Sequence, residues 1–326
     1  MIDWLSNIDA VAGVDPVPAS TDASFRRYFR LQAASNSFIV MDAPPEQEDS
    51  TSFLRIAAIL EALQLNAPRI IEADIEQGFL LLNDLGAVQY LDVLSQTPAL
   101  ADELYDDAMR TLVLLQQRGT AYQGALPPYD DKLLRLELSL FHDWLCETHL
   151  NIKLSDAQEQ QWQGVCDLLV ANALDQAQVF VHRDYHSRNL MLTEQDNPGI
   201  LDFQDAVEGP YTYDLASLLK DCYVRWPETQ VRDWALRFYT QLDDDAHQHS
   251  DVDTFMRHFE LMGVQRHLKA AGIFARLNHR DGKPGYMADI PRTLQYVVEL
   301  GPHYQELDFL IDLIQERCLS ALENSG

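Results

Sequence analysis

Two short runs of sequence carry the chemistry of this chain: VHRDYHSRN at residues 181–189 and ILDFQD at residues 200–205. Each joins an apolar run of strand character to a polar loop that holds Asp or Asn. Phosphoryl transfer needs a carboxylate that orients or deprotonates the attacking hydroxyl, and oxygen ligands that hold Mg²⁺ against a triphosphate. Asp184, Asn189 and Asp202 supply these groups within one short region.

The spacing of these residues resembles that of protein kinases. His-x-Asp with Asn five residues after the Asp matches the catalytic-loop pattern H-R-D-x-x-x-x-N, which implies that Asp184 is the base and Asn189 a metal ligand. Asp202 takes the place of the metal-binding Asp of the D-F-G motif, although Gln204 stands where Gly is usual. Either loop residue alone is more often part of an Asx turn. Order, spacing and strand context together favour a kinase.

A narrower resemblance comes from His186, two residues after the predicted base, and from Asp214 in the YDLA sequence at residues 213–216. Both are similar to the aminoglycoside phosphotransferase and choline kinase family. The resemblance implies a bilobal, protein-kinase-like fold of the α+β class, with ATP and Mg²⁺ as cofactors. We interpret His182 and Asp214 as structural residues that hold the catalytic loop by hydrogen bonds.

Composition limits the partners. The chain has 326 residues, 47% of them hydrophobic, which is enough for two lobes with a sizeable core. Its 51 acidic and 24 basic residues leave a net charge of −27, which opposes binding to nucleic acid or to an anionic membrane. A small-molecule substrate fits better, and no protein partner is implied.

The cysteines and the N-terminus indicate the compartment. The four cysteines form no CxxC pair, so neither a disulfide framework nor a zinc site is predicted, and we expect reduced, mostly buried thiols. Residues 1–14 contain acidic residues and no apolar run of signal-peptide length, and no later segment has the apolar length of a membrane span. We therefore expect a cytoplasmic protein.

Periodicity predicts two lobes. Residues 1–84 are expected to form a small antiparallel-sheet N-lobe that binds nucleotide, with strands at residues 25–31, 38–41, 69–72 and 78–82 and one helix at residues 52–65. Hydroxyls of residues 50–52 are candidates for its N-cap. Residues 85–326 are expected to form a mainly helical C-lobe that carries the catalytic loop and acceptor pocket.

The nucleotide site departs from the kinase pattern. The strand at residues 38–42 lacks the lysine that grips ATP phosphates, and no glycine-rich loop precedes it. We expect backbone amides near Ser24 to face the phosphates, with Arg26, Arg27 or Arg30 supplying charge. Arg26 and Arg30 share one face of the strand and Arg27 lies on the other, and the sequence does not decide between them. Adenine is expected to meet backbone groups of Leu82, Asn83, Asp84 and Leu85.

The acceptor pocket is predicted from local charge. Between Arg257 and Arg292 seven basic residues stand against three acidic ones, which indicates an anion site on an otherwise acidic chain. Two alternatives stay open: the basic residues could form the solvent-exposed face of a helix, and the aromatic candidates could belong to the hydrophobic core. The candidate substrate-binding residues are His186, Asp205, Tyr211, Tyr213, Arg266, His267 and Arg276.

Several further segments resemble the anomeric kinases of bacterial cell-wall recycling. They are SFRRYFR at residues 24–30, VMDAPPE at 40–46, the catalytic loop, GIFARL at 272–277 and HRDGKP at 279–284. The resemblance implies an alcohol-group phosphotransferase that acts on the C1 hydroxyl of N-acetylmuramate and/or N-acetylglucosamine in peptidoglycan recycling. An arginine fork would suit the lactyl carboxylate of N-acetylmuramate.

Two alternatives stay open. An aminoglycoside- or choline-type phosphotransferase would take cationic acceptors, which favour an acid-lined pocket rather than a basic one. A nucleotide-binding pseudokinase that serves as an interaction module is motivated by the absent lysine. The presence of Asp184, Asn189 and Asp202 argues against the second alternative.

Overall fold

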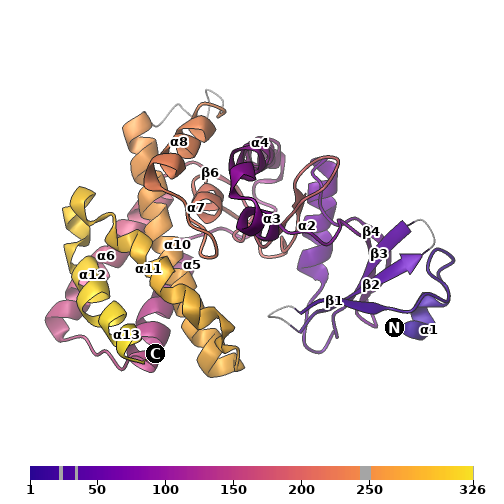
Figure 1. Ribbon diagram of the computed structural model, residues 1–326, viewed down its shortest axis with the longest axis horizontal. Helices are drawn as coiled ribbons and strands as arrows, with labels where there is room; N and C mark the ends of the chain where they lie inside the picture. Colours follow the sequence, from indigo (N-terminus) through magenta and orange to yellow (C-terminus); the bar gives the residue numbers. More distant parts are fainter. Residues whose placement is uncertain (22–24, 34–35, 243–250, 326) are drawn as a thin grey trace. The chain divides into compact units, whose positions relative to one another are not determined.

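The protein, seen in a computed structural model that describes residues 1–21, 25–33, 36–242 and 251–325, consists of two compact units. The N-terminal unit comprises Met1–Val93 and Arg188–Ala206, and the helical unit comprises Leu94–Ser187 and Val207–Gly326. Figure 1 follows the chain through its elements by colour. The catalytic-loop sequence therefore runs from one unit into the other. The lobe boundary after residue 84 stays a prediction.

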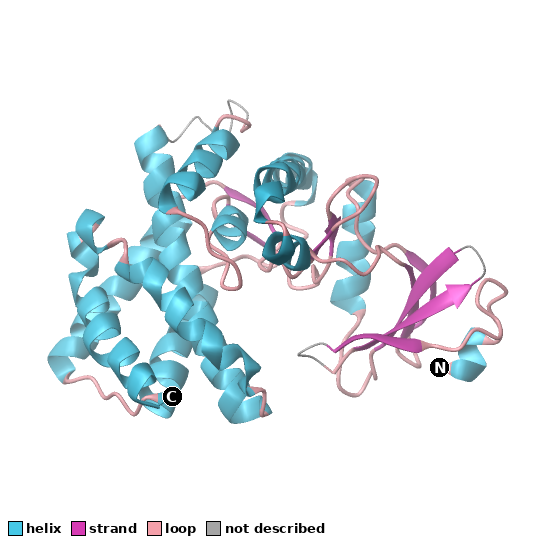
Figure 2. Cartoon of the chain, in the orientation of Figure 1, coloured by secondary structure: helices cyan, strands magenta, loops and turns pink. Residues whose placement is uncertain are grey.

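The N-terminal unit is built on an antiparallel sheet of five strands in the order β1-β2-β3-β5-β4. Figure 2 draws the strands in magenta. Its strands are β1 (Val17–Thr21), β2 (Arg27–Ala33), β3 (Asn36–Asp42), β4 (Ile70–Asp74) and β5 (Phe79–Asn83). The central strand β3 pairs with β2 and β5 in a register that places Ile39 opposite Arg30 on one side and Leu82 on the other.

Alternation along the strands gives one face of this sheet a small core. Leu31, Val40 and Leu81 lie on neighbouring strands with their side chains on the same face, and all are fully buried. Leu5, from helix α1 (Ile2–Leu5), and Val11 pack against them. The N-terminal residues thus cover a face that would otherwise expose apolar side chains to water.

Helix α2 (Thr51–Ala62) buries Phe53, Ile56 and Leu60, which recur at helical spacing on one side. The expected hydroxyl cap from Ser50 is wrong, because Ser50 makes no side-chain capping bond. Instead the Asp49 carboxylate accepts the Thr51 N–H at 2.8 Å. A carboxylate also suits the positive end of the helix dipole.

A second, small hairpin belongs to the N-terminal unit although it lies far along the sequence. Strands β7 (Leu190–Met191) and β8 (Gly199–Ile200) pair with each other. The Ile200 N–H donates to the Asn66 carbonyl at 2.7 Å, which ties the hairpin to the segment after α2. Gly199 is closely packed, since a Cβ there would lie 3.0 Å from Leu85 Cδ1.

In the described residues of the helical unit, strand β6 (Gln178–Val181) pairs with β9 (Val207–Pro210) in a short sheet among many helices. The helices are α3 (Tyr90–Gln96, which begins in the N-terminal unit), α4 (Ala101–Gly119), α5 (Asp131–Leu140), α6 (Asp156–Leu174), α7 (Tyr213–Leu219), α8 (Glu228–Tyr239), α10 (Val252–Asp281), α11 (Ile290–Val298), α12 (Asp308–Asp312) and α13 (Ser320–Ser325). Short 3₁₀ turns are η1 (Pro98–Leu100), η2 (Thr120–Tyr122), η4 (Pro284–Asp289), η5 (Gly301–His303) and η6 (Gln305–Leu307), and π-helical segments are η3 (Phe141–His149) and η7 (Leu313–Leu319).

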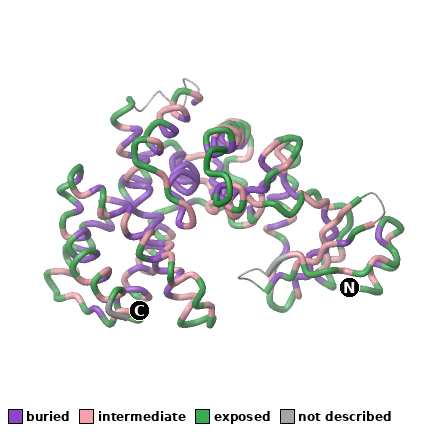
Figure 3. The backbone as a smooth tube through the Cα atoms, viewed as in Figure 1, coloured by how far each residue is buried: buried purple, intermediate pink, exposed green. Residues whose placement is uncertain are grey.

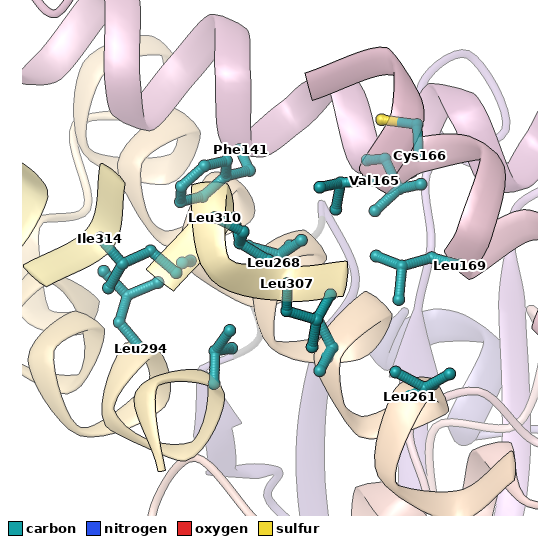
Figure 4. Close-up of a cluster of buried hydrophobic side chains, with 14 of the residues drawn as sticks. Phe141, Val165, Cys166, Leu169, Leu261, Leu268, Leu294, Leu307, Leu310 and Ile314 are labelled. Atoms are coloured by element: carbon teal, nitrogen blue, oxygen red, sulfur yellow. The ribbon is translucent and has the colours of Figure 1, made fainter. Parts of the chain in front are cut away.

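Helix α10 is the central element of the helical unit. It spans 30 residues, and most of its length is buried by surrounding helices (Figure 3). Figure 4 shows the apolar cluster to which α10 contributes Leu261 and Leu268, packed with residues such as Phe141, Leu294 and Ile314 from other helices. Burial of apolar surface on this scale is the main source of stability of the helical unit.

The structure confirms the predicted fold class, with an antiparallel sheet at the N-terminus and a helix-rich remainder. The prediction of free thiols is also confirmed, because all four cysteines are unpaired and buried. Strands β1 and β9 and helices α1, α3, α7 and α11 were not predicted. Within the described residues, none of the helices has both the length and the apolar character that crossing a bilayer requires.

We expect Gly272→Ala to destabilise the protein by about 1–3 kcal/mol, because overpacking at a close helix crossing forces backbone to move. A Cβ on Gly272 of α10 would lie 2.2 Å from the carbonyl carbon of Leu140. Gly164→Ala in α6 is the matched control, since nothing lies within 4 Å of its Cβ position. That variant should be unchanged or more stable by up to about 1 kcal/mol. Urea unfolding measures the stability of the two variants. Equal stabilities would contradict the close contact between Gly272 and the backbone of Leu140.

Candidate active site

The catalytic loop leaves strand β6 over a buried carboxylate. The backbone N–H groups of His182 and Arg183 donate to the two carboxylate oxygens of Asp214, at 2.6 and 3.0 Å. His182 Nδ1 accepts the backbone N–H of Asp184 at 3.2 Å. The prediction that His182 and Asp214 hold the loop by hydrogen bonds is therefore confirmed.

Asp214 is fully buried at the start of α7. Burial raises its pKa to about 7, although the two backbone N–H groups act in the opposite direction. The negative charge of Asp184 also raises the pKa, and the positive charge of Arg266 lowers it. The loop thus rests on a carboxylate whose charge depends on its buried neighbours.

A second carboxylate holds the far end of the loop. Asp221 accepts hydrogen bonds from both the backbone N–H, at 3.0 Å, and the hydroxyl of Ser187. Between the two ends, the Tyr185 hydroxyl donates to the Ala108 carbonyl of α4 at 2.9 Å. Tyr185 and Ser187 are fully buried, so the loop is part of the packed interior of the helical unit.

Arg183, the residue before the predicted base, has a left-handed backbone with φ of 77°. Such a conformation is costly for a residue other than glycine and recurs at functional sites. Its guanidinium pairs with the buried carboxylate of Glu137 on α5. Arg183 is therefore fixed at two points: Asp214 accepts its backbone N–H, and Glu137 pairs with its guanidinium.

Asp184 is partly buried and stays ionised. Burial by itself would raise its pKa, but positive charge on Lys269, His186, Arg183 and His182 outweighs burial and lowers the pKa below its usual value. A carboxylate in this state accepts a hydrogen bond from a hydroxyl readily but is a weak base. Its place in the sequence motif and its charge agree with the predicted role, which stays a prediction.

The predicted metal ligands lie side by side in the N-terminal unit. Asn189 precedes β7 and Asp202 follows β8, and the Asn189 Nδ2 donates to Asp202 Oδ2 at 3.3 Å. Asp202 has a left-handed backbone with φ of 63°, and Gln204 donates to its other carboxylate oxygen at 2.8 Å. The next residue, Phe203, is buried against Phe53 of α2, with ring centroids 4.8 Å apart.

This pair of side chains fits Mg²⁺, which prefers carboxylate and amide oxygens and keeps several waters. Asp202 is exposed and Asn189 is half-buried, so added ligands have access to them. Binding of the ion would require the Asn189 amide to present its oxygen in place of the N–H that now donates to Asp202. Metal binding by these two residues stays a prediction.

The arginines predicted to contact phosphate already pair with carboxylates. Arg30 forms a two-point ion pair with Asp84, at 2.6 and 3.1 Å, and donates to the Gly86 carbonyl at 2.7 Å. Arg26 lies before β2 rather than in it, is buried, and pairs with Glu48 at 3.3 Å. Phosphate contact by either arginine stays a prediction, and Ser24 lies outside the described residues.

The segment predicted to meet adenine is firmly held. Leu82 is buried in β5, and the Asn83 side chain accepts the Arg69 N–H at the end of that strand. Asp84 accepts the Gly86 N–H at 2.9 Å as well as the Arg30 guanidinium. Burial raises the pKa of Asp84, but the bonds from Arg30, Ser37 and Gly86 outweigh it and lower the pKa. The adenine contact itself stays a prediction for Leu82, Asn83, Asp84 and Leu85.

Four of the predicted substrate residues are buried in the helical unit. Arg266 donates to the Cys222 sulfur at 3.4 Å, and His267 contacts the Lys220 carbonyl at 2.8 Å. Tyr213 accepts a hydrogen bond from Lys269 at 2.9 Å, and Tyr211 packs against Phe255 and His258. These contacts give each side chain an internal role, and substrate contact by them stays a prediction.

The remaining three candidates differ in exposure. His186 is buried with its ring 5.4 Å from that of Tyr223 in the helical unit, whereas Arg276 on α10 is half-buried. Asp205 is exposed in the N-terminal unit. The basic region from Arg257 to Arg292 is largely paired, because Arg257, Lys269, Arg280 and Arg292 each have a carboxylate partner. The anion site stays a prediction.

A family model described as "Phosphotransferase enzyme family" matches residues 16–249 of the chain. The chain belongs to this phosphotransferase family. The predicted membership and the predicted class of enzyme are confirmed.

Two relatives of this family member are similar over nearly all of its length. The N-acetylmuramate/N-acetylglucosamine kinase of Pseudomonas aeruginosa is 48% identical over 299 residues, which cover 91% of the chain and 87% of the relative. The protein of the same name from Neisseria meningitidis is 40% identical over 318 residues, covering 96% of the chain and 94% of the relative.

Solved structures show the same fold at low identity. A choline kinase from Streptococcus pneumoniae has a TM-score of 0.62 at 13% identity and covers 91% of this chain and 97% of its own. An aminoglycoside phosphotransferase with bound ADP has a TM-score of 0.57 at 14% identity, covering 90% and 96%. The phosphotransferase thus has the protein-kinase-like fold that was predicted.

Sequence reasoning missed three residues of this phosphotransferase: Glu137, Asp221 and Lys269. Glu137 lies between buried Leu134 and Leu138 on α5, at a position where helical periodicity calls for an apolar side chain. Lys269 lies on the buried part of α10. A charged residue on an apolar helix face was the available signal, because such a residue is rarely buried without a partner.

Asp214→Asn is expected to lower the free energy of unfolding by about 1–3 kcal/mol, since one of the two loop N–H groups would face an amide N–H instead of an acceptor. Turnover should fall as well, because the loop that carries Asp184 would move. The matched control is Asp167→Asn on α6, whose side chain is 65% exposed and pairs with Arg135. Denaturant unfolding and steady-state kinetics measure the effects, and a fully stable, active Asp214→Asn variant would refute the role.

Proposed function

We propose that this phosphotransferase transfers the γ-phosphoryl group of ATP to the C1 hydroxyl of N-acetylmuramate and/or N-acetylglucosamine, as a cytoplasmic kinase of peptidoglycan recycling. The observation that carries the proposal is its identity of 48% and 40% to two kinases of these sugars, over 91% and 96% of the chain. An enzyme that consumes ATP works where ATP is available, which supports the cytoplasm.

In the proposed reaction, Asp184 accepts a hydrogen bond from the C1 hydroxyl and receives its proton. The hydroxyl oxygen forms a bond to the γ-phosphorus, the bond from that phosphorus to the β-phosphate oxygen breaks, and ADP leaves. Phosphoryl transfer depends mostly on positioning and charge stabilisation. The buried supports of the catalytic loop, Asp214 and Asp221, serve that positioning.

The low pKa of Asp184 suits this acceptor. A carboxylate with a lowered pKa is a poor base for an ordinary sugar hydroxyl. The anomeric hydroxyl is more acidic than the other hydroxyls of a sugar, so weak base assistance suffices. Asp184 then acts chiefly by orienting the oxygen toward phosphorus.

Asn189 and Asp202 are the residues that would hold Mg²⁺. Their adjacent side chains, with Asn189 Nδ2 3.3 Å from Asp202 Oδ2, and their places at the two ends of one hairpin support this assignment. When bound, the ion neutralises charge on the phosphates of ATP. A nucleotide site in this fold is also supported by the aminoglycoside phosphotransferase that holds ADP.

ADP release from Mg·ATP should depend on N-acetylmuramate or N-acetylglucosamine as the acceptor. A coupled assay compares these sugars with an aminoglycoside and with choline, and C1-blocked methyl glycosides of both sugars serve as controls. Release with the cationic acceptors alone would favour the aminoglycoside- or choline-type alternative. Binding of ATP without release for any acceptor would favour the interaction-module alternative.

Asp184→Asn should reduce kcat by about 10²–10⁴-fold, the usual contribution of a positioned acid or base, while leaving ATP affinity nearly unchanged. Asp233→Asn is the control, because this side chain is 65% exposed on α8 and pairs with Arg237 at 3.0 Å. Rapid-quench or steady-state kinetics, with nucleotide binding measured separately, tests the expectation. Near-normal turnover in Asp184→Asn would remove Asp184 from the role.

Asp202→Asn should raise the Mg²⁺ concentration needed for half-maximal activity by about tenfold or more, since a ligand charge is lost. Asp196→Asn is the matched control: it lies in the same hairpin and also has a left-handed backbone, with φ of 51°. Asn tolerates that conformation as Asp does. Titration of activity with Mg²⁺ separates the two variants, and superimposable curves would exclude Asp202 as a ligand.

A further inference from the structure

A buried cluster of charges lies behind the catalytic loop in the helical unit. Its centre is Glu137, whose carboxylate pairs with Arg183 of the loop and, at 3.1 Å, with the Nζ of Lys269 on α10. The Tyr129 hydroxyl and the Gln265 amide, at 3.2 Å, donate to its second oxygen. Glu137 and Lys269 are 3% and 7% exposed, so these interactions have little screening by solvent.

The charges in this cluster do not balance without Asp184. Arg183 and Lys269 contribute two positive charges, and Glu137 contributes one negative charge. Burying an uncompensated charge is costly, so a second carboxylate is required nearby. Asp184 follows Arg183 directly in the chain and supplies it.

We propose that Lys269 is a positioning residue for the phosphoryl-transfer reaction: through Glu137 it fixes Arg183, and its own charge stabilises the carboxylate form of Asp184. This inference rests on the proposed role of Asp184. Lys269 is held in place by Tyr213, whose hydroxyl accepts from its Nζ at 2.9 Å. A lysine with two fixed partners keeps its charge in one place relative to the loop.

The electrostatics of the site agree with this geometry. After burial, which acts in the opposite direction, Lys269 is the largest influence on the pKa of Asp184, ahead of His186, Arg183 and His182. Burial also opposes the charge on Lys269, but Glu137 and Asp184 both favour it, and the pKa of Lys269 is raised. Lys269 is therefore cationic over the whole range in which Asp184 titrates.

Further charged groups act on Asp184 besides Lys269. The loop contributes His182, Arg183 and His186, whose positive charge lowers the pKa of Asp184. From α7, the buried Asp214 acts on Asp184 as a like charge, and Arg266 of α10 offsets Asp214. Glu137 of α5 forms ion pairs with both Arg183 and Lys269. Lys269 is thus the cation from outside the loop that acts most strongly on Asp184.

The test compares Lys269→Met with Lys220→Met. Lys220 is a matched control: it is also a buried lysine of the helical unit, but it lies over the Phe259 ring at 5.0 Å, and Glu260, Glu228 and Glu299 are the carboxylates that act on it. For each variant, kcat and KM are measured between pH 3 and pH 9 with the sugar acceptor that is turned over best, because the acidic limb of Asp184 lies below the ordinary carboxyl range.

Lys269→Met is expected to lower kcat at least tenfold and to move the acidic limb of the kcat/KM profile upward by about one pH unit or more. The direction follows because loss of a positive charge raises the pKa of Asp184, so the carboxylate is protonated at a higher pH. Lys269→Arg, which keeps the charge, should leave the limb in place. Lys220→Met should leave both the limb and kcat near those of the unchanged protein.

The double variant Lys269→Met/Glu137→Gln guards against misfolding, since it removes both charges of the pair and avoids a new unpaired buried charge. The limb should shift upward less in it than in Lys269→Met, because removing the negative charge of Glu137 lowers the pKa of Asp184. A folded Lys269→Met enzyme with an unmoved acidic limb would overturn the proposal, even if kcat fell. If Asp184→Asn is inactive while this limb does not move, only the inference about Lys269 fails and the proposed function stands.

Discussion

Two backbone N–H groups of the catalytic loop end on a single buried carboxylate, that of Asp214. A chain that leaves a strand and turns through a left-handed residue at once gives up its ladder partners, and buried amides must find others. Asp214 provides both acceptors and so permits the conformation of Arg183. The backbone position of Asp184, the next residue, follows from this arrangement.

A buried carboxylate creates a charge problem that neighbouring helices solve. Asp214, Glu137 and Asp184 bring negative charge into the helical unit, and Arg266 and Lys269, both buried on α10, oppose it. This explains why an acidic chain concentrates basic residues in that stretch of sequence. Part of the local positive charge compensates the interior and is not available to a substrate anion. Ion clusters of this kind are weak sources of stability, and their retention near a predicted base fits a functional role.

Sequence reasoning succeeded where the signal is local and failed where it depends on tertiary contact. The strands around β3, the helix α2 and the catalytic motif follow from alternation, helical spacing and chain order. Strand β1 contains Pro18 and lies at the sheet edge, and β9 ends in Gly-Pro, so neither has strand composition. Lys269 lies more than 80 residues beyond Asp184, and no spacing rule joins them.

The arrangement of charge on the sheet bears on the missing lysine. The five strands as described carry two cationic residues, Arg27 and Arg30, and each faces a carboxylate, Asp42 and Asp84 respectively. Arg30 thereby fixes the segment after β5, which is a structural use of its charge. If these pairs persist when nucleotide binds, the sheet offers the phosphates little net positive charge. In the proposed reaction the triphosphate would then be stabilised by backbone N–H groups and by the Mg²⁺ that Asn189 and Asp202 are proposed to hold.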